Sequence, residues 1–169
     1  MKKLIHTFKS PGLVYDYAAG KITQDMFWQR VTKYLNVDKK VTQDMEKTWF
    51  NSYKISKGMP EIIEKLRRNY KVVVVSGNLR ERVEFLNKKF NLHKIFDSYF
   101  YSFDYGTNKP SADLCKFVFR KLRIDPEECV MIDDNKKYLL NVKKLRVKTI
   151  QFSNPNNLKK DLKNLSIKL

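Results

Sequence analysis

The sequence predicts an α/β protein built on a parallel sheet, with a small group of helices ahead of it. From Pro60 onward, helix-like and strand-like patterns alternate, and short strands separated by helices of about 10 residues are typical of βαβ units. Between residues 10 and 58 only helical patterns occur. We therefore expect a helical subdomain at 1–57 and an α/β core at 58–169.

Three helices are expected in the first part of the chain, over residues 11–19, 23–35 and 42–53. Gly20 follows the first and is a typical stop signal, while Thr23 and Thr42 can cap the other two through their hydroxyl groups. Apolar residues that recur every three or four positions indicate which helix faces are buried. These faces hold Met26, Phe27, Val31 and Tyr34 in the second helix, and Met45, Trp49 and Phe50 in the third.

The strands of the second part are expected at short apolar runs. Val72–Val75 is a continuous run of β-branched residues, which is typical of a strand buried on both faces. Further strands are expected at 99–103, 129–132 and 147–152. Helical spacing predicts helices at 60–68, 79–90, 111–122 and 136–145, and Leu158, Leu162 and Leu165 predict one more in the tail.

Polar residues follow these apolar runs, at the edge where open parallel sheets hold their ligands. Ser76, Gly77 and Asn78 follow the valine run, where a hydroxyl and free backbone N–H groups can hold a phosphate oxygen. Lys109 is restrained by the following Pro110 and can neutralise charge on a transferring phosphoryl group. Taken singly, a serine after a strand and a lone lysine are also common in turns and on surfaces.

Two adjacent carboxylates, Asp133 and Asp134, come directly after the apolar run that ends at Ile132. Their mutual repulsion is costly unless a cation or hydrogen-bond donors compensate it. Mg²⁺ suits such a pair, because it takes one or two protein carboxylates and keeps several waters. The structural alternative is an Asp-Asp-Asn turn that caps the helix expected from Lys136.

In this order the polar stretches resemble the haloacid dehalogenase-like superfamily, and most closely its branch with a small helical cap. That branch includes sugar-phosphate phosphatases and the phosphatase domain of soluble epoxide hydrolases. The resemblance runs from about Leu4 to about Phe152 and includes the stretches 20–28, 57–66, 109–118 and 125–134. It implies a Rossmann-like core with a helical cap, and a Mg²⁺-dependent phosphatase of small phosphorylated molecules.

The resemblance also implies a role for each polar residue. Ser76 would hydrogen-bond the phosphoryl group, together with the backbone of Gly77 and the side chain of Asn78. Lys109 would steady both the nucleophile and the phosphate. Asp134 would bind Mg²⁺. Asp133 would support the metal directly or through a water, and Asn135 would contact the residues that bind the ligand without binding it directly.

One departure from the family pattern dominates the interpretation. The family uses an Asp-x-Asp after its first and central strand as nucleophile and general acid, and no Asp-x-Asp occurs in this chain. Leu4–Phe8 resembles the segment that follows that loop, so we expect the central strand to be absent. Each unpaired backbone group left buried would cost about 1–3 kcal/mol. An absent central strand would leave a gap between the strands expected at Val72–Val75 and 129–132. These two strands could close together, Met1–Phe8 could fill the gap, or another chain could donate a strand through self-association. Little or no turnover and weakened Mg²⁺ binding are expected.

The net charge of +17 leaves other functions open. A pseudoenzyme could bind phosphate or a phospho-ligand without turnover, and a basic protein could bind nucleic acid or an anionic surface. The lysines are spread along the chain, however, as on a solvated surface. No apolar run approaches the roughly 20 residues of a membrane span, so we expect a cytoplasmic protein. Cys115 and Cys129 lack metal-site spacing and are expected to be reduced packing residues.

Overall fold

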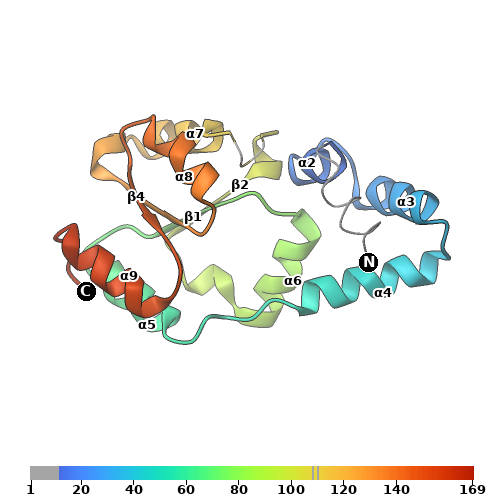
Figure 1. Cartoon of the computed structure of the whole chain (residues 1–169), viewed down its shortest axis with the longest axis horizontal. Coiled ribbons are helices and arrows are strands. Elements are labelled where there is room, and N and C mark those ends of the chain that lie inside the picture. Colours follow the sequence, from blue (N-terminus) through green and yellow to red (C-terminus); the bar gives the residue numbers. More distant parts are fainter. Residues whose placement is uncertain (1–11, 108, 110) are drawn as a thin grey trace.

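The computed structural model describes residues 12–107, 109 and 111–169, so the predictions for Met1–Phe8, Pro11 and Pro110 lie outside the described residues. In Figure 1 the helices α2 to α4 lie at one end of the molecule, the strands lie toward the other, and α6 lies between them. None of the described helices is long and apolar enough to cross a membrane. The elements are α2 (Leu13–Ala18), α3 (Gln24–Leu35), α4 (Lys39–Asn51), α5 (Met59–Arg67), β1 (Val73–Ser76), α6 (Arg80–Phe90), η1 (Leu92–Lys94), β2 (Ser98–Tyr101), η2 (Ser102–Asp104), α7 (Asp113–Leu122), η3 (Pro126–Glu128), β3 (Val130–Asp133), α8 (Lys136–Lys143), β4 (Lys148–Gln151) and α9 (Pro155–Asn164).

The starts of α3 and α4 show one correct and one wrong prediction of a helix cap. Thr23 caps α3, because its Oγ1 accepts a hydrogen bond from the N–H of Met26 at 3.2 Å. The α4 helix begins earlier than expected, after Asp38, and Thr42 lies inside it. Thr42 is instead buried, with its hydroxyl 2.9 Å from that of Thr32 on α3. Thr42, which the sequence suggested as a helix cap, therefore forms a tertiary hydrogen bond instead.

The N-terminal helices, which we define as α2, α3 and α4, enclose an apolar cluster of their own. Its buried members are Tyr17, Phe27, Val31 and Phe50, joined by Leu79 from the segment before α6. Only two residues of the face predicted for α3 are buried; Met26 and Tyr34 are exposed. The prediction was wrong for those two because the buried stripe of α3 is narrow.

The strands pair in parallel, as expected, but in two separate pairs. β1 pairs with β2 from Val73 opposite Ser98, and β3 pairs with β4 from Val130 opposite Lys148. In the part of the chain that the structure describes, no hydrogen-bonded strand joins β1 to β3. The expectation that the Val72–Val75 run is fully buried on both faces was wrong. The β1 residues are only partly buried, because one edge of this strand has no described neighbour.

Both strand pairs share two layers of helices. On one face, α5 and α9 bury Ile62, Leu66, Leu158 and Leu162 against Ile150, with Val72, Val130 and Ile132 alongside. On the other face, α7 and α8 bury Cys115, Tyr138 and Val142, with Val75 and Met131 alongside. Successive strand residues point to opposite faces, which explains why Met131 belongs to a different layer from its two neighbours. The layer of α7 and α8 thus contacts both strand pairs, through Val75 and Met131, while the layer of α5 and α9 contacts β3, β4 and Val72, the residue before β1.

Asp97 connects the segment before β1 to α5 through two hydrogen bonds. We expect its carboxylate to make the free energy of unfolding depend on pH. Its Oδ2 accepts a hydrogen bond from the N–H of Val72 at 2.8 Å, and its Oδ1 accepts one from Arg67 Nε at 2.9 Å. The Val72 hydrogen bond, helped by the Arg67 ion pair, holds the pKa of Asp97 below its usual range. A depressed pKa in the folded state stabilises the protein above the unfolded-state pKa, and this stabilisation is lost as the pH falls through the folded-state pKa.

We therefore expect Asp97→Asn to be about 1 kcal/mol less stable than the unchanged chain at pH 7, with the difference shrinking below about pH 4. Urea unfolding at pH 7, 5 and 3.5 measures this directly. Asp44→Asn, at an exposed position on α4, serves as the control and should change little. A difference for Asp97→Asn that stays constant over this pH range would contradict the prediction.

Candidate phosphate and magnesium site

Two of the predicted site residues meet where the strand pairs end. Asp133 is the last residue of β3, and Lys109 lies in the loop between η2 and α7. The Lys109 ammonium donates a hydrogen bond to Asp133 Oδ2 and forms an ion pair with it. The Asp133 side chain is only 8% exposed. The lysine therefore compensates a nearly buried carboxylate, and the pair holds the loop against the end of β3.

The backbone of Gly77 lies directly against the Lys109 side chain. A Cβ atom placed on Gly77 would lie 2.5 Å from Cβ of Lys109 and 3.4 Å from its Cδ. Any side chain at this position would push on the base of the lysine rather than on its flexible end. Because Gly77 directly follows Ser76 at the end of β1, the two strand ends and Lys109 come together at one place. The structure brings Gly77, Lys109 and Asp133 together, and the phosphate-binding roles expected of these residues and of Ser76 stay predictions.

The Asn78 side chain is held in a different set of contacts. Its Oδ1 accepts hydrogen bonds from the N–H of Leu79 at 2.9 Å and from Nε of Arg82 at 2.5 Å. The oxygen of this side chain is thus committed to the start of α6. Direct contact between Asn78 and a phosphate stays a prediction, and any such contact would have to come from the amide nitrogen.

The two adjacent carboxylates differ in their surroundings. Asp133 uses both oxygens, because its Oδ1 also accepts a hydrogen bond from the N–H of Asn135 at 2.8 Å. Asp134 is exposed, and its carboxylate has no hydrogen-bond or ion-pair partner among the described residues. Asn135 caps α8 by accepting the N–H of Tyr138 at 3.1 Å. The capping turn, which the sequence offered as an alternative to a metal site, is therefore formed and leaves the Asp134 carboxylate open.

This donor set fits a weakly held Mg²⁺. Mg²⁺ is commonly bound through one or two carboxylates, with waters and phosphate oxygens completing an octahedron. Asp134 can supply one such oxygen, and Asp133 stands beside it with its charge already matched by Lys109. Within the described ranges, no group of three or more His, Cys, Asp or Glu side chains could hold a metal ion. Any Mg²⁺ here would depend on waters and phosphate for most of its ligands.

Tyr138 is a contact of Lys109 that sequence reasoning missed. The Lys109 ammonium lies 4.9 Å from the centre of the Tyr138 ring, a cation–π distance. The ring is buried, and its hydroxyl lies 3.0 Å from Sγ of Cys115. Burial raises the pKa of both Tyr138 and Cys115, so both are neutral near pH 7. The one signal in the sequence was an aromatic residue in the first turn of the helix that follows Asp133-Asp134.

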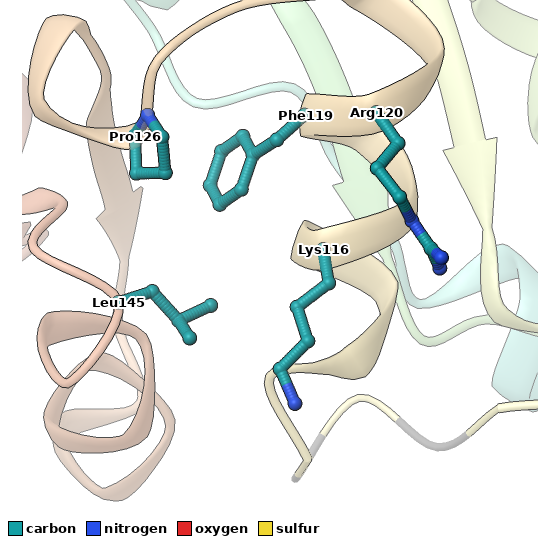
Figure 2. Close-up of a pocket in the computed structure, with 5 residues that line it drawn as sticks. All are labelled: Lys116, Phe119, Arg120, Pro126 and Leu145. Atoms are coloured by element: carbon teal, nitrogen blue, oxygen red, sulfur yellow. The ribbon is translucent and has the colours of Figure 1, made fainter.

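A separate hollow of about 420 Å³ lies beside α7 and contains none of the predicted site residues. Figure 2 shows Phe119, Pro126 and Leu145 facing one another, while Arg120 points away from them. Phe119 and Leu145 also pack against the core cluster between α7 and α8. The hollow is thus an apolar edge of that layer, and the strand ends remain the candidate site.

A family model described as haloacid dehalogenase-like hydrolase matches residues 15–152. The chain belongs to this family. Two uncharacterized proteins also match this chain in sequence. A protein of Dictyostelium discoideum is 28% identical over 106 residues, covering 60% of this chain and 46% of the relative. A protein of Schizosaccharomyces pombe that is named an uncharacterized hydrolase is 27% identical over 86 residues, covering 45% of this chain and 38% of the relative. The matches thus span less than half the length of both.

Solved structures of this hydrolase family share the fold. A HAD family enzyme of Bacteroides thetaiotaomicron has a TM-score of 0.78 at 20% identity, covering 90% of this chain and 78% of that one. The same enzyme, in complex with magnesium and inorganic phosphate, has a TM-score of 0.77 at 20% identity and covers 90% and 80%. A HAD-like hydrolase of Porphyromonas gingivalis has a TM-score of 0.75 at 20% identity and covers 99% and 91%. The α/β fold expected from the sequence is therefore confirmed.

Proposed function

We propose that this hydrolase-family chain binds Mg²⁺ and the phosphoryl group of a small phosphorylated molecule at the ends of β1 and β3. The observation that carries this proposal is the Lys109–Asp133 pair lying against Gly77. In this arrangement a cation, a glycine backbone and a carboxylate from three distant segments of the chain lie together, at the edge where parallel sheets hold ligands. The magnesium and phosphate held by a relative with the same fold support the choice of ligands.

Each residue would contribute a distinct interaction. Ser76 offers a hydroxyl at the end of β1, and the absence of a side chain on Gly77 lets the Lys109 side chain lie against the backbone there. Lys109 carries the positive charge that would meet the phosphate oxygens. Asp134 would hold Mg²⁺, which when bound neutralises phosphate charge. We assign the N-terminal helices the role of the cap, within the predicted subdomain 1–57.

We further propose that the 169-residue chain binds such a ligand without hydrolysing it. The family forms an aspartyl-phosphate on the first carboxylate of an Asp-x-Asp, and this sequence contains none. Asp133 lies at the end of β3 and outside any Asp-x-Asp, and its oxygens accept hydrogen bonds from Lys109 and from the N–H of Asn135. Positioning groups alone do not supply a nucleophile. The chain then has the binding half of a phosphatase site.

Titration calorimetry with Mg²⁺ and inorganic phosphate tests the binding proposal. We expect Mg²⁺ to bind more tightly in the presence of phosphate, because phosphate supplies ligands that the protein lacks. Asp134→Ala should weaken Mg²⁺ binding at least about tenfold, or about 1.4 kcal/mol. Asp44→Ala on the exposed side of α4 is the control and should bind as the unchanged chain does. Absence of any heat of binding for both ions would overturn the proposal.

Release of phosphate from an aryl phosphate in the presence of Mg²⁺ tests whether the chain hydrolyses its ligand. We expect no release above the Asp134→Ala background. Turnover that Asp134→Ala abolishes would reveal a nucleophile elsewhere in the chain and would contradict binding without hydrolysis. Purification of the two proteins side by side excludes a contaminating phosphatase as the source.

The partner predictions that rest on charge or on the open strand edges remain predictions. Binding to nucleic acid or an anionic surface has the net charge of +17 as its sole basis. Self-association through β1 or β3 has only the unjoined strand pairs. Neither observation identifies a partner, whereas the Lys109–Asp133 site has a defined ligand chemistry.

A further inference from the structure

Arg82 occupies an unusual place for an arginine, buried where α6, α4 and the loop after β1 meet. It is only 8% exposed. Its Nε donates a hydrogen bond to Oδ1 of Asn78 at 2.5 Å. Its guanidinium carbon lies 4.8 Å from the centre of the Trp49 ring and 5.0 Å from that of Tyr53. The guanidinium thus contacts the loop that follows Ser76 and two aromatic rings at the end of α4.

The charge of Arg82 has no carboxylate partner among the described residues. None of the described ion pairs includes it, although three arginines near the surface, Arg67, Arg68 and Arg80, each have one. Burial lowers the pKa of Arg82, and the nearby Tyr53 and Tyr17 act in the opposite direction. An arginine stays protonated even so, and a buried charge without a counter-charge is costly. The two aromatic faces offset part of that cost through cation–π attraction.

The residues around Arg82 connect the N-terminal helices to the same loop. Leu79 is buried in the cluster formed by Tyr17, Phe27, Val31 and Phe50. The Tyr17 hydroxyl donates a 2.6 Å hydrogen bond to Glu81 Oε2. The start of α6 is therefore held by the N-terminal helices at Leu79, Glu81 and Arg82. A shift of these helices cannot leave Asn78 in place, since Asn78 Oδ1 is bonded to two of the residues that move.

We propose that Arg82 is a positioning residue that couples the N-terminal helices to the Ser76–Asn78 loop. It fixes Asn78 through Nε and transmits displacement of the loop to the Trp49 ring. Asn78 adjoins Gly77, which lies against Lys109, so phosphate bound there acts on this chain of contacts. The coupling to phosphate rests on the proposed function, whereas the link between Arg82 and the loop does not.

Trp49 fluorescence reports the coupling. The chain has two tryptophans, so Trp28→Phe leaves Trp49 as the sole emitter, and phosphate is titrated in the presence of Mg²⁺. We expect phosphate to change the Trp49 emission in this background. Adding Arg82→Met should abolish that change and weaken phosphate binding, measured by calorimetry, about tenfold. Arg82→Lys should not rescue either readout, because an ammonium lacks the planar fork that spans Asn78 and the rings.

Arg80→Met is the matched control on the same helix. Arg80 pairs with Asp104 at 3.2 Å and lies over Phe103, and its side chain is more than half exposed. It should leave the emission change and the phosphate affinity as they are. A Trp49 response that survives Arg82→Met, or that Arg80→Met removes equally, would overturn the proposal.

Amide hydrogen exchange tests the link without phosphate. The N–H of Leu79 is bonded to Asn78 Oδ1, so loss of the Arg82 contact should speed exchange in a peptide covering 77–81. We expect faster exchange there in Arg82→Met and no change in Arg80→Met. If Arg82→Met fails to fold, the milder Arg82→Lys serves the same comparison. Unchanged exchange in a folded Arg82 variant would overturn the positioning role. Absence of phosphate binding with altered exchange would overturn only the proposed function.

Discussion

Replacing Phe27 by alanine is expected to lower the free energy of unfolding by about 3–5 kcal/mol. Phe27 is fully buried at the centre of the N-terminal helices. Its ring stacks on Tyr17 at 4.8 Å between centroids and meets the edge of Trp28 at 5.1 Å. Alanine would remove apolar area from the core and leave a cavity that the surrounding side chains fill only in part. Such a loss is comparable with the whole stability of many domains, about 5–15 kcal/mol.

Urea unfolding followed by circular dichroism measures this loss, and Tyr34→Ala provides the control on the same helix. Tyr34 is 53% exposed, so its removal should change stability by no more than about 0.5 kcal/mol. Because Leu79 belongs to the Phe27 cluster, Phe27→Ala should also loosen the start of α6. Equal effects of the two substitutions would show that α3 does not bury the face described here.

The order and type of the elements could be predicted because each depends on local patterns. The valine run gives a strand, proline and glycine frame helices, and short alternating elements imply parallel pairing. The start of α4 could not be predicted in the same way. Asp38 and Thr42 are both good caps, and the choice between them depends on the hydrogen bond between Thr42 and Thr32 of another helix. Exposure of the β1 valines likewise depends on which strands neighbour them, which no local pattern encodes.

The candidate site divides in a similar way. Ser76 and Asp133 could be predicted to lie at one edge of the sheet, because they are polar residues at the ends of parallel strands, and Lys109 follows another strand-like run along the chain. That Lys109 pairs with Asp133, and that Asp134 stays open, required the three-dimensional arrangement. Tyr138 and Arg82 were missed because an aromatic residue or an arginine on a helix usually belongs to a core or a surface. Their importance comes from cation–π contacts with residues far away in the sequence.

Replacing Lys109 by methionine is expected to reduce phosphate affinity about 100-fold, equivalent to about 2.7 kcal/mol. The substitution keeps the length of the side chain but removes the cation that would meet the phosphate. It also leaves the Asp133 carboxylate, which is 8% exposed, without its ion pair. Lys109→Met should therefore lower stability as well, since an uncompensated carboxylate in a nearly buried position costs free energy. Calorimetry and urea unfolding measure the two effects separately.

The double variant Lys109→Met, Asp133→Asn separates the two roles of the lysine. Removing both charges leaves no buried charge uncompensated, so stability should return to near that of the unchanged chain. Phosphate affinity should stay as low as in Lys109→Met alone, because neither variant has the cation. Recovery of phosphate binding together with stability would show that Lys109 serves only to neutralise Asp133. The proposed phosphate site would then have to be sought away from the ends of β1 and β3.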